Sequence, residues 1–195
     1  MKSPDRRRFL QQSSLLAGAS LLGATPGLRA ASSGRFGRND ELRVALVGCG
    51  GRGTGAAVQA LSTEGPVKLV AVADAFPDRM NGALQQIAKA KPDRVDVPEE
   101  RRFVGFDAYR KAIDSGVDVV ILATPPGFRP MHFDYAVRQG KHVFMEKPVA
   151  VDGPGIRTVL AAAGIAKEKG LKVGVGLQRH HSAKYNATIA RLQEG

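Results

Sequence analysis

A strand that ends abruptly in a run of glycines is the feature that most constrains this chain. The segment LRVALVGCGGRGTGAAVQAL begins with an apolar strand at 42–47 and continues as a helix from about Arg52. Gly48, Gly50 and Gly53 give the pattern G-x-G-x-x-G between the two. In such a turn the first glycine allows the tight turn, the second lets the backbone approach a pyrophosphate, and the third lets the helix pack closely on the strand. The pattern predicts a dinucleotide-binding βαβ unit.

The residues around this turn predict which dinucleotide is bound. The start of a helix offers free backbone N–H groups and a partial positive charge to phosphate, so Gly51 and Arg52 belong to the same predicted site. A second strand at 67–73 ends on Asp74, about 20 residues after the turn, where an acid accepts hydrogen bonds from ribose hydroxyls. A carboxylate there also repels a 2′-phosphate, which favours NAD over NADP. Arg79 would soften that preference.

Helices and strands continue to alternate after Asp74. We expect helices at 83–90, 106–114, 128–140, 153–169 and 182–195, strands at 117–124, 142–145 and 172–178, and a polar connection at 91–102. The segment 117–124 is almost continuously apolar, as expected of a strand that is covered on both faces. Such alternation implies right-handed crossovers and a parallel sheet. The predicted fold class is therefore α/β, a Rossmann-like doubly wound parallel sheet.

Two further segments are expected at the ligand-binding edge of this sheet. Ligands of such sheets bind beyond the carboxyl ends of the strands. Thr124 and Pro125 follow one predicted strand, and Glu146, Lys147 and Pro148 follow another. The acid and the base at this strand end are therefore expected to face the cofactor cleft, whereas the alternative is a solvated strand end.

The positive charge of the chain is concentrated at its beginning. The formal net charge is +11, and seven basic residues lie within 1–38 against Asp5 alone. The remaining residues show no basic stripe with interleaved aromatic residues, so a nucleic-acid partner is not expected. The single cysteine, Cys49, excludes an internal disulfide.

The first residues resemble an export signal. A basic start is followed by a mildly apolar run at about 13–25 and then by small residues, which is the layout of a secretory signal. Arg6 and Arg7, followed by Phe9 and Leu10, resemble the twin-arginine motif. The sequence predicts a partnership with the twin-arginine export machinery, and a periplasmic protein or one anchored to the membrane and facing the periplasm. The alternative is a disordered basic tail.

The run ATPPGFRPMHFDYAVRQGKHVFMEKPVA, together with the glycine turn upstream, resembles the Gfo/Idh/MocA oxidoreductase family over about 42–195. This resemblance implies that Lys147 is catalytic and reaches the substrate hydroxyl and the nicotinamide region. It implies that Glu146 contacts the cofactor ribose or fixes Lys147, and that Thr124 and Pro125 line the cofactor. It also implies that Pro148 follows a cis peptide bond, as it often does in this family.

The sequence pattern places three of the histidines. His180 and His181 follow the last predicted strand and are placed near the substrate side. No third ligand is evident beside them, so no metal site is predicted. His132 lies on a predicted helix, where a structural role is favoured over a catalytic one.

The resemblance divides the chain into three parts. These are a signal and linker at 1–38, a dinucleotide-binding domain at 39–178, and the start of a substrate domain at 179–195, the rest of which is expected to be missing. The favoured function is an NAD-dependent oxidoreductase of a sugar, cyclitol or related polyol, present here as its nucleotide-binding part and a homo-oligomer at full length. An NAD-dependent glycoside hydrolase of the same fold and a non-catalytic nucleotide-binding fragment are the alternatives.

Overall fold

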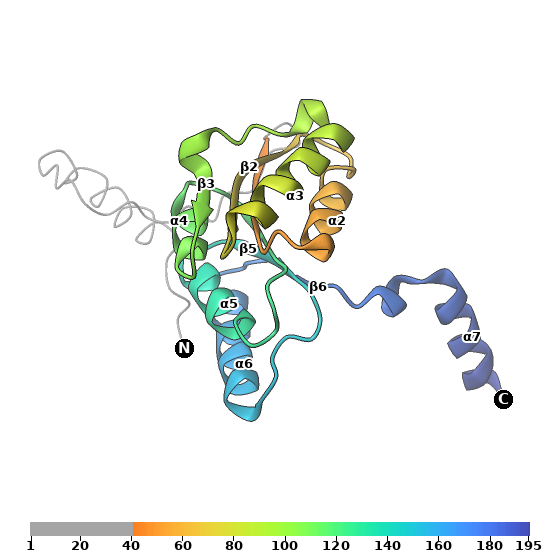
Figure 1. Ribbon diagram of the computed structural model, residues 1–195. Helices are drawn as coiled ribbons and strands as arrows, with labels where there is room; N and C mark the ends of the chain where they lie inside the picture. Colours follow the sequence, from red (N-terminus) through yellow and green to blue (C-terminus); the bar gives the residue numbers. More distant parts are fainter. Residues whose placement is uncertain (1–40) are drawn as a thin grey trace, which may run out of the picture. The chain divides into compact units, whose positions relative to one another are not determined.

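The computed structural model describes residues 41–195, so the predictions for the export signal lie outside the described residues. These residues form a parallel six-stranded sheet in the order β3-β2-β1-β4-β5-β6 (Figure 1). The strands are β1 (Leu42–Val47), β2 (Val67–Asp74), β3 (Arg102–Val104), β4 (Val119–Leu122), β5 (His142–Met145) and β6 (Val173–Val175). This order reverses between β1 and β4, which confirms the predicted doubly wound Rossmann-like fold.

Helices cover both faces of the sheet. They are α2 (Gly51–Ala60), α3 (Pro77–Ala90), α4 (Ala108–Asp114), α5 (Arg129–Arg138) and α6 (Gly153–Glu168). A further helix, α7 (Ala183–Glu194), has no buried residues and does not pack on the sheet. Three short 3-10 helices are η1 (Pro92–Arg94), η2 (Glu99–Arg101) and η3 (Gln178–His181). Helices α2 and α3 pack on one face, and α4, α5 and α6 pack on the other (Figure 1). Within the described residues, no helix has the length and apolar character needed to cross a membrane.

The alternation of side chains along β1 explains why the sheet has two buried faces. Val44 and Leu46 pack with the apolar residues of α2 and α3, whereas Ala45 and Val47 pack on the opposite side with Tyr109 and other residues of α4, α5 and α6. Burial on both faces gives the central strands their continuous apolar sequence.

The strand ends meet at one edge because all neighbouring strands are parallel. Val47 is opposite Ala73 on one side and Leu122 on the other. Leu122 is in turn opposite Met145. The residues that follow these positions, including Gly48, Asp74, Thr124 and Glu146, therefore come together at the carboxyl edge.

Two glycines of the turn are required by close backbone contacts. Gly48 has φ +95°, and a Cβ on it would lie 2.5 Å from the backbone nitrogen of Thr124. A Cβ on Gly53 would lie 1.9 Å from the carbonyl oxygen of Gly48. These distances confirm the tight turn and the close helix packing inferred from the pattern.

The sequence interpretation was wrong at one strand and imprecise at several element ends. The predicted polar connection at 91–102 contains two 3-10 helices and ends in β3, a short edge strand. Arg102 and Val104 are exposed, so β3 lacks the apolar run from which a buried strand is recognised. Helix α3 begins at Pro77, before the predicted start at 83, and β6 covers only three residues of the predicted 172–178.

We predict that Gly53→Ala destabilises the fold, because its Cβ would overlap the Gly48 carbonyl oxygen and neither backbone segment can move freely. The free energy of unfolding, measured by urea denaturation, should fall by at least about 2 kcal/mol. Gly55→Ala is the matched control, since it lies in the same helix and its Cβ would meet nothing within 4 Å. That control should gain roughly 0.5–1 kcal/mol. Equal stability of the two variants would contradict the prediction.

Candidate functional site

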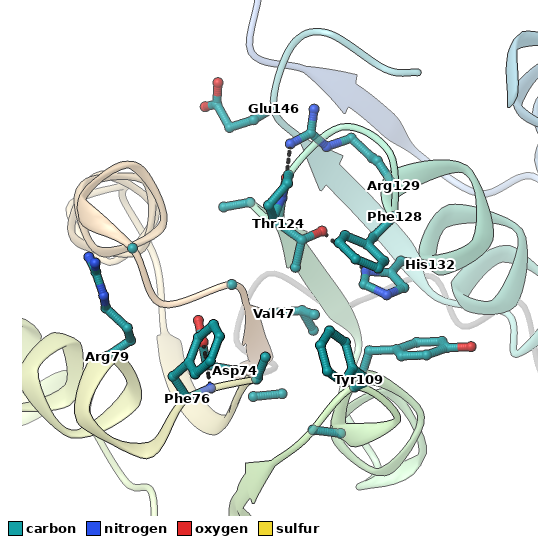
Figure 2. Close-up of a pocket in the computed structure, with 18 of the residues that line it drawn as sticks. Val47, Asp74, Phe76, Arg79, Tyr109, Thr124, Phe128, Arg129, His132 and Glu146 are labelled. Atoms are coloured by element: carbon teal, nitrogen blue, oxygen red, sulfur yellow. Dashed lines mark hydrogen bonds between the residues drawn. The ribbon is translucent and has the colours of Figure 1, made fainter. Parts of the chain in front are cut away.

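A cavity of about 530 Å³ lies at the carboxyl edge of the sheet. Figure 2 shows Thr124, Arg129, His132 and Glu146 on one side of it, and Asp74, Phe76 and Arg79 on the other. Eight of the predicted site residues line it: Gly48, Gly50, Arg52, Asp74, Thr124, Pro125, Glu146 and Lys147. Gly51 and Gly53 lie in the first turn of α2, next to the lining residues, but do not line the cavity themselves.

The glycine turn leaves space for an anionic group at the start of α2. Gly50 is the N-cap residue and supplies no capping side chain, and the first turn of the helix contains no acidic residue. A Cβ on Gly50 or Gly51 would meet nothing within 4 Å. The N–H groups of the first helical turn are therefore accessible to a phosphate, and the residues present fit a dinucleotide.

Asp74 organises the turn as well as facing the cavity. Its carboxylate accepts a hydrogen bond from the backbone N–H of Cys49 at 2.6 Å and another from the N–H of Phe76 at 3.0 Å. The sequence placed Asp74 at the cavity but did not reveal the bond to Cys49. Burial, with the nearby Asp74 charge, raises the pKa of the Cys49 thiol to about 12, so this thiol stays protonated and is a poor nucleophile.

Glu146 is a buried carboxylate that is paired with the glycine turn. Only 4% of Glu146 is exposed, and its Oε1 lies 2.7 Å from Nη2 of Arg52. The contact is an ion pair rather than an aligned hydrogen bond, since Oε1 has no hydrogen-bond partner of good geometry. It raises the pKa of the half-exposed Arg52. The pair joins the end of β5 to the start of α2.

Gly176 accommodates the same carboxylate from the other side. A Cβ on Gly176 would lie 2.7–2.8 Å from the carboxylate atoms of Glu146. Any side chain at this position would displace the carboxylate. Sequence reasoning missed this role, although a second glycine two residues after Gly174 at the end of a strand was an available signal.

Arg129 is a functional candidate that sequence reasoning also missed. It is 2% exposed, and its guanidinium donates hydrogen bonds to the carbonyl oxygens of Thr124 and Pro148 (Figure 2 shows the first). Burial lowers its pKa, and the nearby charge of Glu146 opposes that shift. Arg129 thus connects the loop after β4 to the turn after β5. A cation in the first turn of α5, where the helix dipole disfavours it, was the available signal.

Lys147 lies where two cavities meet. Its side chain is exposed, and the Lys147–Pro148 peptide bond is cis, as the family resemblance implied. A second cavity of about 660 Å³ is lined by Arg52, Glu146, Lys147, Gly176, Leu177, Gln178, Arg179 and His180. Arg52, Glu146 and Lys147 therefore form a wall common to both cavities.

The predicted histidines are divided between the two cavities. His180 lines the second cavity, and His181 lines neither. His132 lines the first cavity, where its Nδ1 lies 3.2 Å from Oγ1 of Thr124 and its ring stacks on Tyr109 with 4.1 Å between centroids. Burial, with the charges of Arg129 and Arg110, lowers the pKa of His132 to about 4. The neutral ring holds the Thr124 hydroxyl in place.

We predict that stability depends on pH through His132. Its folded pKa of about 4 is below the ordinary 6.5, so the unfolded chain binds more protons between these values and stability is lost as the pH falls through them. The free energy of unfolding should fall by about 2 kcal/mol between about pH 7 and pH 5. For His132→Gln, urea denaturation should show a loss between these two pH values that is smaller by this amount. His181→Gln, an exposed control, should retain the full dependence, and the same slope in all three proteins would refute the assignment.

Known proteins resemble this chain across the domain that contains the site. Residues 42–177 match the family model described as an oxidoreductase family with an NAD-binding Rossmann fold. Inositol 2-dehydrogenase of Rhizobium meliloti is 30% identical over 154 residues, covering 79% of this chain and 41% of that protein. Glycosyl hydrolase family 109 protein 2 of Shewanella sp. is 31% identical over 168 residues, covering 77% of this chain and 35% of that protein.

A solved structure shows the same fold. Scyllo-inositol dehydrogenase from Lactobacillus casei with bound NAD(H) and scyllo-inositol aligns with a TM-score of 0.61 and 20% identity, covering 80% of this chain and 42% of that one. The chain thus spans less than half the length of each of these three proteins. Because the family model covers well over half of its residues, the chain belongs to the Gfo/Idh/MocA oxidoreductase family and carries the NAD-binding Rossmann domain of that family.

Proposed function

We propose that the protein is an NAD-dependent oxidoreductase of a sugar, a cyclitol or a related polyol, and that residues 39–178 are its nucleotide-binding domain. The observation that carries the proposal is the position of Lys147 on the wall between two cavities. The first cavity contains the glycine turn and Asp74, which fit a dinucleotide. The second cavity is available to a second molecule, so the exposed amine lies where cofactor and substrate would meet. Inositol 2-dehydrogenase and scyllo-inositol dehydrogenase are among the similar proteins, which supports a polyol substrate.

Each residue of the site then has a physical role. Bound NAD would supply the hydride acceptor. The N–H groups at the start of α2 bind the diphosphate, and Asp74 accepts hydrogen bonds from the ribose. Thr124 and Pro125 line the cofactor cavity. Oxidation of a secondary alcohol releases a proton with the hydride, and Lys147 is placed to take that proton from the hydroxyl and to return it in the reverse direction.

The buried charges favour the second of the two roles expected for Glu146. Its carboxylate is compensated by Arg52 and lies close enough to Arg129 for their charges to interact. Arg129 also binds the carbonyl oxygen of Pro148, the residue after Lys147. In the proposed enzyme Glu146 and Arg129 are therefore positioning residues that fix the Lys147 turn.

Glycoside hydrolysis with bound NAD is the second candidate function. The similarity to glycosyl hydrolase family 109 protein 2 of Shewanella sp. favours it. The two functions differ in their net products. An oxidoreductase accumulates NADH with a free polyol, whereas a hydrolase releases free sugar from a glycoside without net NADH.

Export and assembly complete the proposal. The twin-arginine pattern at Arg6 and Arg7 supports export and a periplasmic or membrane-anchored location facing the periplasm. Residues 1–38 then form the signal and linker, and 179–195 form the start of the substrate domain. A homo-oligomer at full length is proposed from the family resemblance alone.

Asp74 should select NAD over NADP. Charge-assisted hydrogen bonds contribute about 1.5–3 kcal/mol, so Asp74→Ala should weaken NAD binding about tenfold or more and NADP binding less. Calorimetry with both nucleotides checks this, with Asp78→Ala as the control because Asp78 lies nearby in α3 but does not line the cavity. Tighter binding of NADP than of NAD by the unmodified protein would contradict the role of Asp74.

Lys147 should affect turnover far more than cofactor binding. In a chain of the relatives' full length, Lys147→Met should lower kcat by about 10²–10⁴-fold, the usual contribution of general acid–base catalysis. The NAD Kd should change little, because the glycine turn and Asp74 provide most of that binding. The 195-residue chain by itself should bind NAD weakly and oxidise nothing. Near-normal turnover of the full-length variant, or substrate oxidation by the short chain, would defeat the proposal.

Export should depend on the arginine pair. Replacing Arg6 and Arg7 by lysine keeps the charge but removes the pattern that resembles the twin-arginine motif. We expect the double variant to remain in the cytoplasm, as measured by cell fractionation and immunoblotting. Replacing Arg35 and Arg38 by lysine is a control with the same chemistry outside the pattern. Unchanged export of the first variant would contradict the assignment of a twin-arginine signal.

A further inference from the structure

The second cavity has a positively charged wall. Four of its eight lining residues have basic side chains: Arg52, Lys147, Arg179 and His180. Glu146 is the single acid among the lining residues. The balance of charge that a ligand meets here depends on which of these groups are already paired.

The negative charge of Glu146 is compensated within the protein. Its carboxylate is buried, lies 2.7 Å from Nη2 of Arg52, and interacts with the charge of Arg129. Within residues 41–195, neither Lys147 nor Arg179 has a carboxylate oxygen within 4.0 Å. A ligand in this cavity therefore meets two uncompensated cations.

Arg179 is suited to bind an anion. Its guanidinium lies over the ring of Tyr185, with the central carbon 5.3 Å from the ring centroid, so one face is occupied by an aromatic ring. The N–H groups at the guanidinium edge have no hydrogen-bond acceptor among the described residues. A guanidinium matches the two oxygens of a carboxylate or phosphate group, and a concave wall focuses its potential. A neutral polyol has no anionic group that could form an ion pair with this guanidinium.

We propose that the second cavity binds a substrate with an anionic group, a carboxylate or a phosphate, and that Arg179 holds this group while Lys147 faces the reacting hydroxyl. This inference rests on the proposed function, since it names the substrate class of the same site. It distinguishes the protein's substrate from the neutral cyclitols in the names of two similar proteins.

The first measurement is binding, which does not depend on the reaction. Calorimetry on a chain of the relatives' full length, saturated with NAD, would compare glucuronate and glucose 6-phosphate with glucose, the neutral sugar of the same ring. One of the two anions should bind about tenfold to a hundredfold more tightly than glucose, and this preference should shrink in high salt. Comparison of glucuronate with glucose 6-phosphate shows whether the site prefers a carboxylate or a phosphate. The absence of a preference for either anion overturns the inference, whatever the reaction is.

A variant then tests the residue. Arg179→Gln should weaken binding of the preferred anionic sugar about tenfold or more and leave the affinity for glucose unchanged. Arg191→Gln, an arginine of α7 that lines none of the cavities described, should retain the preference. An equal loss for charged and neutral sugars in Arg179→Gln would indicate a structural role and overturn the assignment.

The second measurement separates the inference from the proposed function. NADH formation is followed with the same three sugars, and release of free sugar is followed from matched glycosides with and without a carboxylate. Sugar release without NADH would refute the oxidoreductase while an anionic preference in binding would still support the inference. NADH formation with a kcat/KM for glucose at least equal to those for both anions would support the oxidoreductase and overturn the inference.

Discussion

The Glu146 carboxylate is the buried charge on which the rest of the site depends. An isolated charge of this kind is costly to bury, and the cost is offset only when partners surround it. Here the cationic partners come from different parts of the chain, Arg52 from the first turn of α2 and Arg129 from α5, while Gly176 after β6 leaves the space that the carboxylate fills. Compensating one carboxylate therefore fixes three segments relative to one another at the carboxyl edge of the sheet.

This arrangement also explains why Lys147 is available. Glu146 and Lys147 are adjacent in the sequence, and an acid next to a base suggests a pair. The structure separates them, because Glu146 is buried among arginines while Lys147 is exposed. Since the arginines satisfy the acid, the lysine amine is left for a substrate.

Most of the fold could be predicted from the sequence, but part of the site could not. The doubly wound sheet and the glycine turn followed from apolar periodicity and from the spacing of Gly48, Gly50 and Gly53. Strand β3 was missed because an edge strand of three residues carries no apolar run. Arg129 and Gly176 were missed because their importance comes from contacts with Pro148 and Glu146, and no local pattern records such contacts.

The sequence by itself determined the features that depend on neighbouring residues: the strand, turn and helix at 42–60, the acid at the end of β2, and the parallel order implied by alternation. These are local because backbone sterics and side-chain periodicity act over a few residues. Only the tertiary structure decided that Arg52 neutralises Glu146, that His132 holds Thr124, and that the Lys147 wall separates two cavities. The physical reason is that charge compensation and packing act through space, so the partner of a buried group is chosen by the fold and not by its place in the chain.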